Sequence, residues 1–323
     1  MTLCMGRSDL LRVLDAHAGL DRLWDGFTAR AAGEDPTRRR LRVTLPDPGG
    51  APGNNAAALT TGLLAGIPAY TVTDHAAFGQ EAAAARGVVC LHDLSSGELL
   101  ALLDSGALAT WRTGLTAALG THSLARFDAE SLGVLGCDTR AGLLARGLTR
   151  LRPISGMLVA DPDRKRAEEF ADRCATELGL AVRVAGGAAA VAAEADIVLL
   201  SAGAGASLDR ADARPGTHIT AIPAHDGAGG SGGAVLSAEL SRLARVVVDD
   251  AELAACPGVL ADSGQAIGTL RDVLTGATAA REGADDITVY VPVGLPWQDL
   301  VLSWLAYRGA REAGVGTDVD FLA

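Results

Sequence analysis

Short apolar runs alternate with stretches of helical spacing over the second half of the chain. After residue 130 the runs are LGVLG, GMLVAD, AVRVAG, DIVLLSAG, HITAIPA and ARVVVDD, and helical patterns such as Arg164–Leu178 lie between them. Apolar strands that alternate with helices are typical of a parallel, doubly wound α/β sheet. The pattern predicts such a lobe over residues 116–296.

The first part of the chain has a different pattern. Residues 8–32 carry apolar positions at helical spacing, with Ser8 placed as an N-cap, and predict one long helix. The runs GVVCLHD (87–93) and ELLALLD (98–104) flank LSSG and predict an antiparallel hairpin, whereas LPDPGGAPGNN (45–55) predicts a turn-rich loop. A last apolar helix over 297–313 follows the strand DITVYVPVG and is expected to return to this region. We therefore predict an α+β lobe made of residues 1–115 and 297–323.

Composition and charge narrow the class of partner. The chain has 323 residues, of which 49% are hydrophobic, and a formal net charge of -11. A strongly acidic balance argues against nucleic acid or an anionic membrane as the main partner, because both attract clustered Lys and Arg. No uncharged apolar run approaches the length of a bilayer span, and the first residues lack the pattern of a secretion signal. We expect a cytoplasmic protein that binds a small molecule.

The cysteines and lysines limit the kinds of site that this chain can form. The five cysteines are widely scattered and never in CxxC spacing, so they predict neither a disulfide framework nor a metal site. Lys165 is the only lysine, so 27 of the 28 basic residues other than histidine are arginines.

The stretch SLGVLGCDTRAGLLARG (131–147) resembles the dinucleotide fingerprint GxGxxG, with one letter changed. The three fingerprint places hold Gly136, Asp138 and Ala141, and Asp161 ends the next strand about 25 residues on, where a carboxylate accepts hydrogen bonds from a ribose diol. Asp138 puts a negative charge where the pyrophosphate is expected, and the repulsion would reach about 4 kcal/mol, or about a thousandfold in affinity.

Two explanations of Asp138 remain open from the sequence. Arg140, in the first turn of the predicted helix, or Arg164, after the second strand, could offset its charge. Alternatively, Asp138 caps the helix and fills the anion site itself. Ser201, at the end of the strand in DIVLLSAG, completes the predicted cofactor-binding set.

Several longer segments carry a family resemblance. LHDLSSGELLALLD, LATWRTGLTAALGTHSLAR, the glycine turn, and ITVYVPVGLPWQDLVLSWLAYRGAREAGVG together resemble the ornithine cyclodeaminase and mu-crystallin family over most of the chain. The resemblance implies a Rossmann-type lobe and a dimerising N-terminal lobe completed by the last helix. It also implies a homodimeric enzyme that uses NAD or NADP to oxidise or reduce a C–N bond at the α-carbon of an amino or imino acid.

The resemblance also assigns substrate-binding residues. Arg112, within the segment TWRT (110–113), matches the family arginine that binds the substrate carboxylate, and Arg42 matches a second one. A guanidinium suits this role because it offers paired donors to a carboxylate. An arginine in an apolar helix needs a partner, which favours a function for Arg112 over a place on the helix surface. For Arg42, next to Arg38–Arg40, a solvated basic run fits equally well.

Two positions depart from the family pattern. Pro68 stands where the resemblance implies a substrate-binding lysine. The family's acid/base aspartate should follow the strand in HITAIPA, where this chain has His225 and then Asp226. Either could move a proton, and histidine has the better ordinary pKa for work near neutrality. Both could equally be polar residues of a flexible loop.

The leading hypothesis is a divergent nicotinamide-dependent enzyme of amino-acid or specialised metabolism. NAD is favoured over NADP because the Asp161 carboxylate would repel a 2′-phosphate. The alternatives are a family member that binds a small ligand without redox chemistry, and a lyase that needs no dinucleotide.

Overall fold

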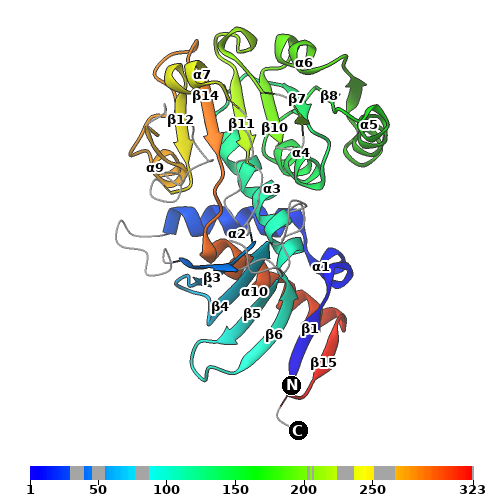
Figure 1. Cartoon of the computed structure of the whole chain (residues 1–323), viewed down its shortest axis with the longest axis vertical. Helices are drawn as coiled ribbons and strands as arrows, with labels where there is room; N and C mark the ends of the chain where they lie inside the picture. The colour runs from blue at the N-terminus through cyan, green and yellow to red at the C-terminus, as the bar shows by residue number, and fades with distance from the viewer. Residues whose placement is uncertain are drawn as a thin grey trace. The chain divides into compact units, whose positions relative to one another are not determined.

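The computed structural model describes residues 1–29, 40–45, 55–77, 87–201, 204–205, 207–223, 236–250 and 266–321 (Figure 1). The chain forms two compact units. The first unit contains Met1–Arg112 and Gly294–Ala323, and the second contains most of the residues from Thr113 to Val293.

The second unit is built on one eight-stranded sheet in the order β13-β12-β14-β11-β10-β7-β8-β9, in which all paired strands are parallel. The strands are β7 (Ser131–Leu135), β8 (Gly156–Ala160), β9 (Ala181–Val184), β10 (Ile197–Ser201), β11 (His218–Ile222), β12 (Arg245–Val248), β13 (Gly268–Thr269) and β14 (Thr288–Val291). The chain winds outward from β7 in one direction and then from β10 in the other. This order confirms the predicted doubly wound sheet, and it puts a topological switch point between β7 and β10.

Helices connect these strands. They are α4 (Thr139–Leu151), α5 (Arg164–Leu178), α6 (Ala188–Glu194), η3 (Arg210–Asp212), α7 (Ala238–Leu243) and α9 (Leu270–Leu274). Helix α5 packs on β8 and β9, and α6 packs on β7 and β8. Strands β7, β8, β10 and β11 are almost entirely buried, which explains why they appear in the sequence as continuous apolar runs.

The first unit is built on a seven-stranded sheet in the order β15-β1-β6-β5-β4-β3-β2. Its strands are β1 (Thr2–Met5), β2 (Arg40–Leu45), β3 (Asn55–Gly62), β4 (Ala69–Ala77), β5 (Val88–Asp93), β6 (Leu99–Asp104) and β15 (Thr317–Val319). Strands β5 and β6 pair antiparallel, as predicted for the hairpin. The sequence patterns did not predict β1 to β4 or β15.

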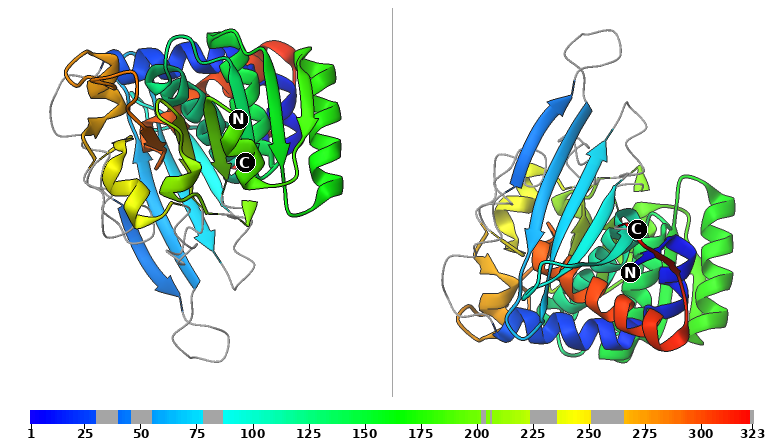
Figure 2. Two further views of the ribbon diagram at one scale, coloured as in Figure 1. Left: turned by 90° about the horizontal axis from the view of Figure 1, so that it is seen from above. Right: turned by 90° about the horizontal axis from the view of Figure 1, so that it is seen from below.

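One face of this sheet is covered by helices. Helix α10 (Pro296–Ala313) lies against β3, β4, β5 and α2 (Ala16–Ala29), and Figure 2 shows α10 and α2 beside the strands. The helix α3 (Ser105–Leu124) follows β6. Trp297 is fully buried, and a Cβ added to Gly26 would lie 2.3 Å from its ring, so only glycine allows α2 to approach so closely. The last helix therefore returns to the first unit, as predicted.

The single helix predicted over 8–32 is wrong. The chain forms α1 (Arg7–Val13) and then α2, because Leu14 is extended and the Asp15 carboxylate accepts a hydrogen bond from Ala18 N at 2.9 Å to start a new helix. Gly6, and not Ser8, is the N-cap of α1. The predicted loop is also shorter, because Leu45 and Asn55 end β2 and begin β3; residues 30–32 and 46–54 lie outside the described part. No described helix is long and apolar enough to cross a membrane.

Candidate functional site

The turn between β7 and α4 has the geometry of a dinucleotide fingerprint. Gly136 has φ +88°, a conformation that side chains rarely adopt, and a Cβ there would lie 3.0 Å from Ala204 N. Ala141, at the third fingerprint place, is fully buried on α4. The first and third places therefore serve the turn and the helix packing, as the sequence predicts.

Asp138 lies at the N-terminus of α4 and has several partners. Its Oδ1 accepts a hydrogen bond from Ala141 N at 2.9 Å, so Asp138 is the N-cap of the helix. Its Oδ2 accepts from Arg140 Nε at 3.0 Å, Arg140 Nη2 at 2.7 Å and Ser201 Oγ at 2.7 Å. We call these three residues the Asp138–Arg140–Ser201 cluster. Asp138 therefore caps the helix, and Arg140 offsets its charge. The capping and the charge compensation that the sequence left open as alternatives are both present.

The cluster lies at the carboxyl ends of β7 and β10, on either side of the switch point. Ser201 ends β10 and is fully buried, and Arg140 also reaches Pro223 O, just after β11, at 3.4 Å. Ligands of doubly wound sheets bind outside the carboxyl ends of the strands at such a point. Arg164 takes no part in it, because it is 78% exposed and its Nε donates to Glu168 at 2.9 Å.

Asp161, predicted to hold the adenosine ribose, is saturated with hydrogen bonds. Its Oδ2 accepts from Cys137 N at 2.8 Å and Arg166 Nε at 2.9 Å, and its Oδ1 accepts from Asp163 N at 2.8 Å and Arg166 Nη2 at 2.5 Å. Burial alone would raise the pKa of Asp161, but these hydrogen bonds outweigh it and hold the pKa below its ordinary value. Asp161 therefore ties the end of β8 to the glycine turn.

Arg112 in the first unit is a buried cation. It is 4% exposed, and its Nη1 donates to both carboxylate oxygens of Asp299, each at 2.9 Å. Gly294 has φ +76°, and a Cβ there would lie 2.7 Å from Arg112 Nη2. These contacts exclude a place for Arg112 on the helix surface and fix the orientation of its guanidinium.

The structure describes less of the other positions that the sequence singled out. Arg42 is in β2, where it pairs with Ala58 of β3, and its side chain lies outside the described part. His225 and Asp226 also lie outside the described residues. Pro68 directly precedes β4, and its carbonyl accepts from Leu94 N at 3.1 Å.

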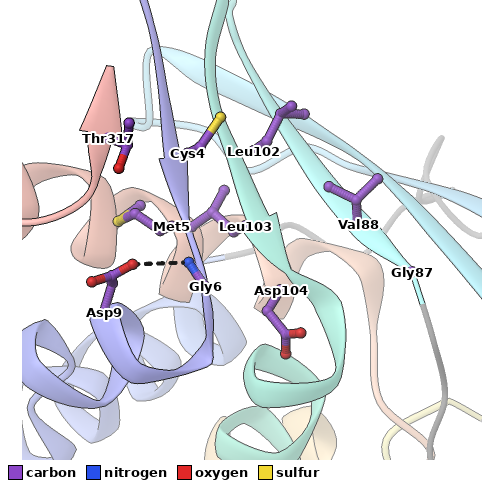
Figure 3. Close-up of a pocket in the computed structure, with 10 residues that line it drawn as sticks. All are labelled: Cys4, Met5, Gly6, Asp9, Gly87, Val88, Leu102, Leu103, Asp104 and Thr317. Carbon is purple, nitrogen blue, oxygen red and sulfur yellow. Dashed lines mark hydrogen bonds between the residues drawn. The ribbon is translucent and has the colours of Figure 1, made fainter. Parts of the chain in front are cut away.

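A separate hollow in the first unit, of about 420 Å³, contains none of the predicted site residues (Figure 3). Its lining includes two carboxylates. The Asp9 carboxylate accepts from Gly6 N at 3.1 Å, and the Asp104 carboxylate accepts from Ala107 N at 2.6 Å, so each one caps the start of a helix. The hollow is therefore not a candidate catalytic site.

Sequence reasoning missed two residues that contact the predicted set. Arg166 follows Asp161 by five positions, and a basic residue in the first turn of the next helix is a signal that could have suggested it. Asp299 is 187 residues from Arg112 and gave no local signal. Among the described residues, no group of three or more His, Cys, Asp or Glu side chains could hold a metal ion.

Comparison with known proteins gives consistent matches. The model of the ornithine cyclodeaminase/mu-crystallin family matches residues 59–314. Delta(1)-pyrroline-2-carboxylate reductase of Bacillus cereus is 28% identical over 73% of this chain and 74% of its own. Alanine dehydrogenase of Archaeoglobus fulgidus is 29% identical over 72% of this chain and 73% of its own.

A solved structure also matches almost the whole chain. Thermococcus litoralis Delta(1)-pyrroline-2-carboxylate reductase, in complex with NADH and L-proline, aligns over 98% of this chain and 100% of its own, with 24% identity and a TM-score of 0.84. The likeness shows a common fold, with a Rossmann-like parallel-sheet lobe and a separate sheet lobe.

Proposed function

The chain belongs to the ornithine cyclodeaminase/mu-crystallin family, and from that premise we propose that it is a nicotinamide-dependent enzyme acting on a C–N bond at the α-carbon of an amino or imino acid. Relatives named for pyrroline-2-carboxylate reduction and alanine dehydrogenation support this reaction class, since both names describe redox chemistry at a carbon that bears nitrogen beside a carboxylate. We place the reaction in amino-acid or specialised metabolism in the cytoplasm.

The Asp138–Arg140–Ser201 cluster is the observation that carries the cofactor proposal. The turn at Gly136 and the N-terminus of α4 are the usual place of a pyrophosphate, and Arg140 adds a partly exposed cation there, while the buried Ser201 helps to hold Asp138. Arg140 brings the local charge of the cluster to about zero, so the residues fit a dinucleotide. A bound nicotinamide would supply or accept the hydride.

In the substrate, the carboxylate is the group that Arg112 and Arg42 would hold. Arg112 is already oriented by Asp299, which reduces the entropy lost on binding. His225 or Asp226 would move the proton at the nitrogen. Because Pro68 replaces the lysine, the substrate must be bound without that ammonium group, so we do not assign ornithine. In this proposal residues 1–115 and 297–323 bind the substrate and form the dimer, and residues 116–296 bind the cofactor.

Calorimetric titration of NADH and NADPH tests the cofactor proposal. Because Arg140 and Asp138 offset each other, Arg140→Ala leaves an uncompensated carboxylate and should weaken binding by roughly 10- to 1000-fold, whereas Asp138→Gly leaves an uncompensated guanidinium and should tighten binding. Arg146→Ala is the matched control, since Arg146 lies on the same helix and is paired with Glu177 away from the cluster.

The main alternative is a protein that binds a small ligand without nicotinamide chemistry. It is favoured by one feature, the Asp138 carboxylate on the N-terminus of α4. In that case neither nucleotide binds wild type, Asp138→Gly or Arg140→Ala, and the glycine variant loses only a few tenths of a kcal/mol of stability. That result would reject the dinucleotide proposal.

We also propose a homodimer formed by the first unit. The sheet face opposite the buried row of Leu3, Ala101 and Leu91 carries half-buried apolar side chains, namely Cys4, Val72, Val88, Cys90 and Leu102. We call these five residues the outer sheet face. A contiguous apolar surface of this kind is a common site of association. The archaeal alanine dehydrogenase among the similar structures is described as a dimer.

A further inference from the structure

The end of β8 presents a cation, although the sequence places a carboxylate there. The Asp161 side chain is 1% exposed, whereas that of Arg166 is 49% exposed. A carboxylate has about four acceptor positions, and Cys137 N, Asp163 N and two nitrogens of Arg166 occupy them. A ribose diol could bind Asp161 only by displacing one of these donors.

Arg166 keeps donors for a ligand. Its Nε and Nη2 bind Asp161, and among the described residues no acceptor is bound to its Nη1. The neighbouring Arg164 and Lys165 are 78% and 83% exposed, and their pairs with Glu168 and Glu169 are surface pairs that contribute little stability and exchange readily. Arg166 is therefore the cation beside Asp161, and Arg164 and Lys165 precede it in the first turn of α5.

We propose that Arg166 makes this a 2′-phosphate site, so that the enzyme prefers NADP(H) to NAD(H); this inference rests on the dinucleotide proposal above. A 2′-phosphate accepts from the outer edge of Arg166 while the ion pair with Asp161 stays intact. Rossmann-type sites accommodate the 2′-phosphate with an arginine near the end of this strand. The sequence expectation of NAD assumed an exposed Asp161, and the ion pair with Arg166 removes that assumption.

The decisive comparison is binding measured by calorimetry, which needs no substrate. For wild type we expect NADPH to bind at least about tenfold more tightly than NADH, and adenosine 2′,5′-bisphosphate to bind at least about tenfold more tightly than adenosine 5′-monophosphate. Arg166→Gln should weaken NADPH by roughly 10- to 100-fold and change NADH by less than about threefold. Arg173→Gln, on an exposed position of the same helix, is the matched control and should leave all four ligands unchanged.

The two proposals fail in different ways. If NADH binds as tightly as NADPH or more tightly, the 2′-phosphate inference is overturned and the dinucleotide proposal stands. If neither nucleotide binds wild type, the dinucleotide proposal fails and the inference fails with it. The comparison of the two adenosine phosphates uses only wild-type protein, so it decides the point even if Arg166→Gln does not fold.

Discussion

At the scale of single residues, the Arg112–Asp299 pair shows how a candidate substrate-binding residue depends on its partner. Both side chains are almost fully buried, at 5% and 2% exposure, and the pair is held by two hydrogen bonds from one guanidinium nitrogen. Burying two charges costs desolvation energy that only good geometry repays. We therefore regard Asp299 as the positioning residue for Arg112.

This interpretation makes a stability prediction that is independent of any substrate. Asp299→Asn removes the carboxylate charge that is hydrogen-bonded to a buried guanidinium, so we expect it to lower the free energy of unfolding by about 3 kcal/mol. The double variant Arg112→Met/Asp299→Leu should recover most of that loss. Chemical denaturation measures both. Glu168→Gln, which breaks an exposed pair, is the control and should cost less than about 1 kcal/mol. A loss that small for Asp299→Asn would contradict the role assigned to it.

At the scale of secondary-structure elements, a buried histidine links three of them. His218 of β11 is fully buried, with Nδ1 2.9 Å from Thr288 Oγ1 of β14 and Nε2 2.9 Å from Thr220 Oγ1, which in turn contacts Thr121 Oγ1 of α3 at 2.6 Å. Burial, with Arg281 and Arg152 nearby, holds the pKa of His218 well below its ordinary value. The imidazole is therefore neutral in the folded protein.

A neutral buried histidine makes the protein sensitive to acid. Below about pH 6.5 the unfolded chain binds a proton at His218 that the folded chain does not, so stability falls by up to about 1.4 kcal/mol per pH unit. We expect His218→Gln to show a shallower loss than wild type between pH 6.5 and 5 in denaturant titrations. Parallel curves for wild type and His218→Gln would rule out this contribution.

How well the sequence predicts a strand depends on whether the strand itself is apolar or is instead stabilised by contacts with distant elements. Strands β10 and β11 are buried along their whole length and β7 along all but its first residue, so each is an apolar run that the sequence shows directly. Strands β3 (NAAALTTG) and β4 (AYTVTDHAA) contain mainly alanine and threonine and are stabilised by pairing with each other and by α10, which no local pattern reveals.

The contacts of the candidate site also differ in how well the sequence predicts them. Gly136, Asp138 and Arg140 are neighbours in sequence, so their association was predictable, and the parallel pairing of β7 with β10 brings Ser201 to them. Two further partners change the interpretation. Arg166 pairs with Asp161 from five positions on, because α5 starts shortly after β8, so a local signal could have suggested it. Asp299 reaches Arg112 across 187 residues, and that contact depends on the fold and not on spacing.

At the scale of the whole molecule, the outer sheet face carries the argument for assembly. The pairing register aligns Cys4, Leu102, Cys90 and Val72 across four strands, and all four are half-buried in the single chain. Helices α1 and α10 contact the sheet, and α2 packs against α10. A second copy of the chain would remove the outer sheet face from water and gain roughly 25 cal/mol for each Å² of apolar surface.

Light scattering after size exclusion tests this dimer. We expect wild type at micromolar concentration to have twice the mass of the 32.8 kDa chain. Leu102→Glu places a charge at the centre of the outer sheet face, where burying it unpaired would cost several kcal/mol, so this variant should be monomeric. Leu243→Glu, at a 59% exposed position of α7 in the second unit, is the control and should stay dimeric.

A monomeric wild type would reject the dimer. A dimeric Leu102→Glu with native circular dichroism would instead move the interface to another surface, because a face that tolerates a buried glutamate is not the one that associates.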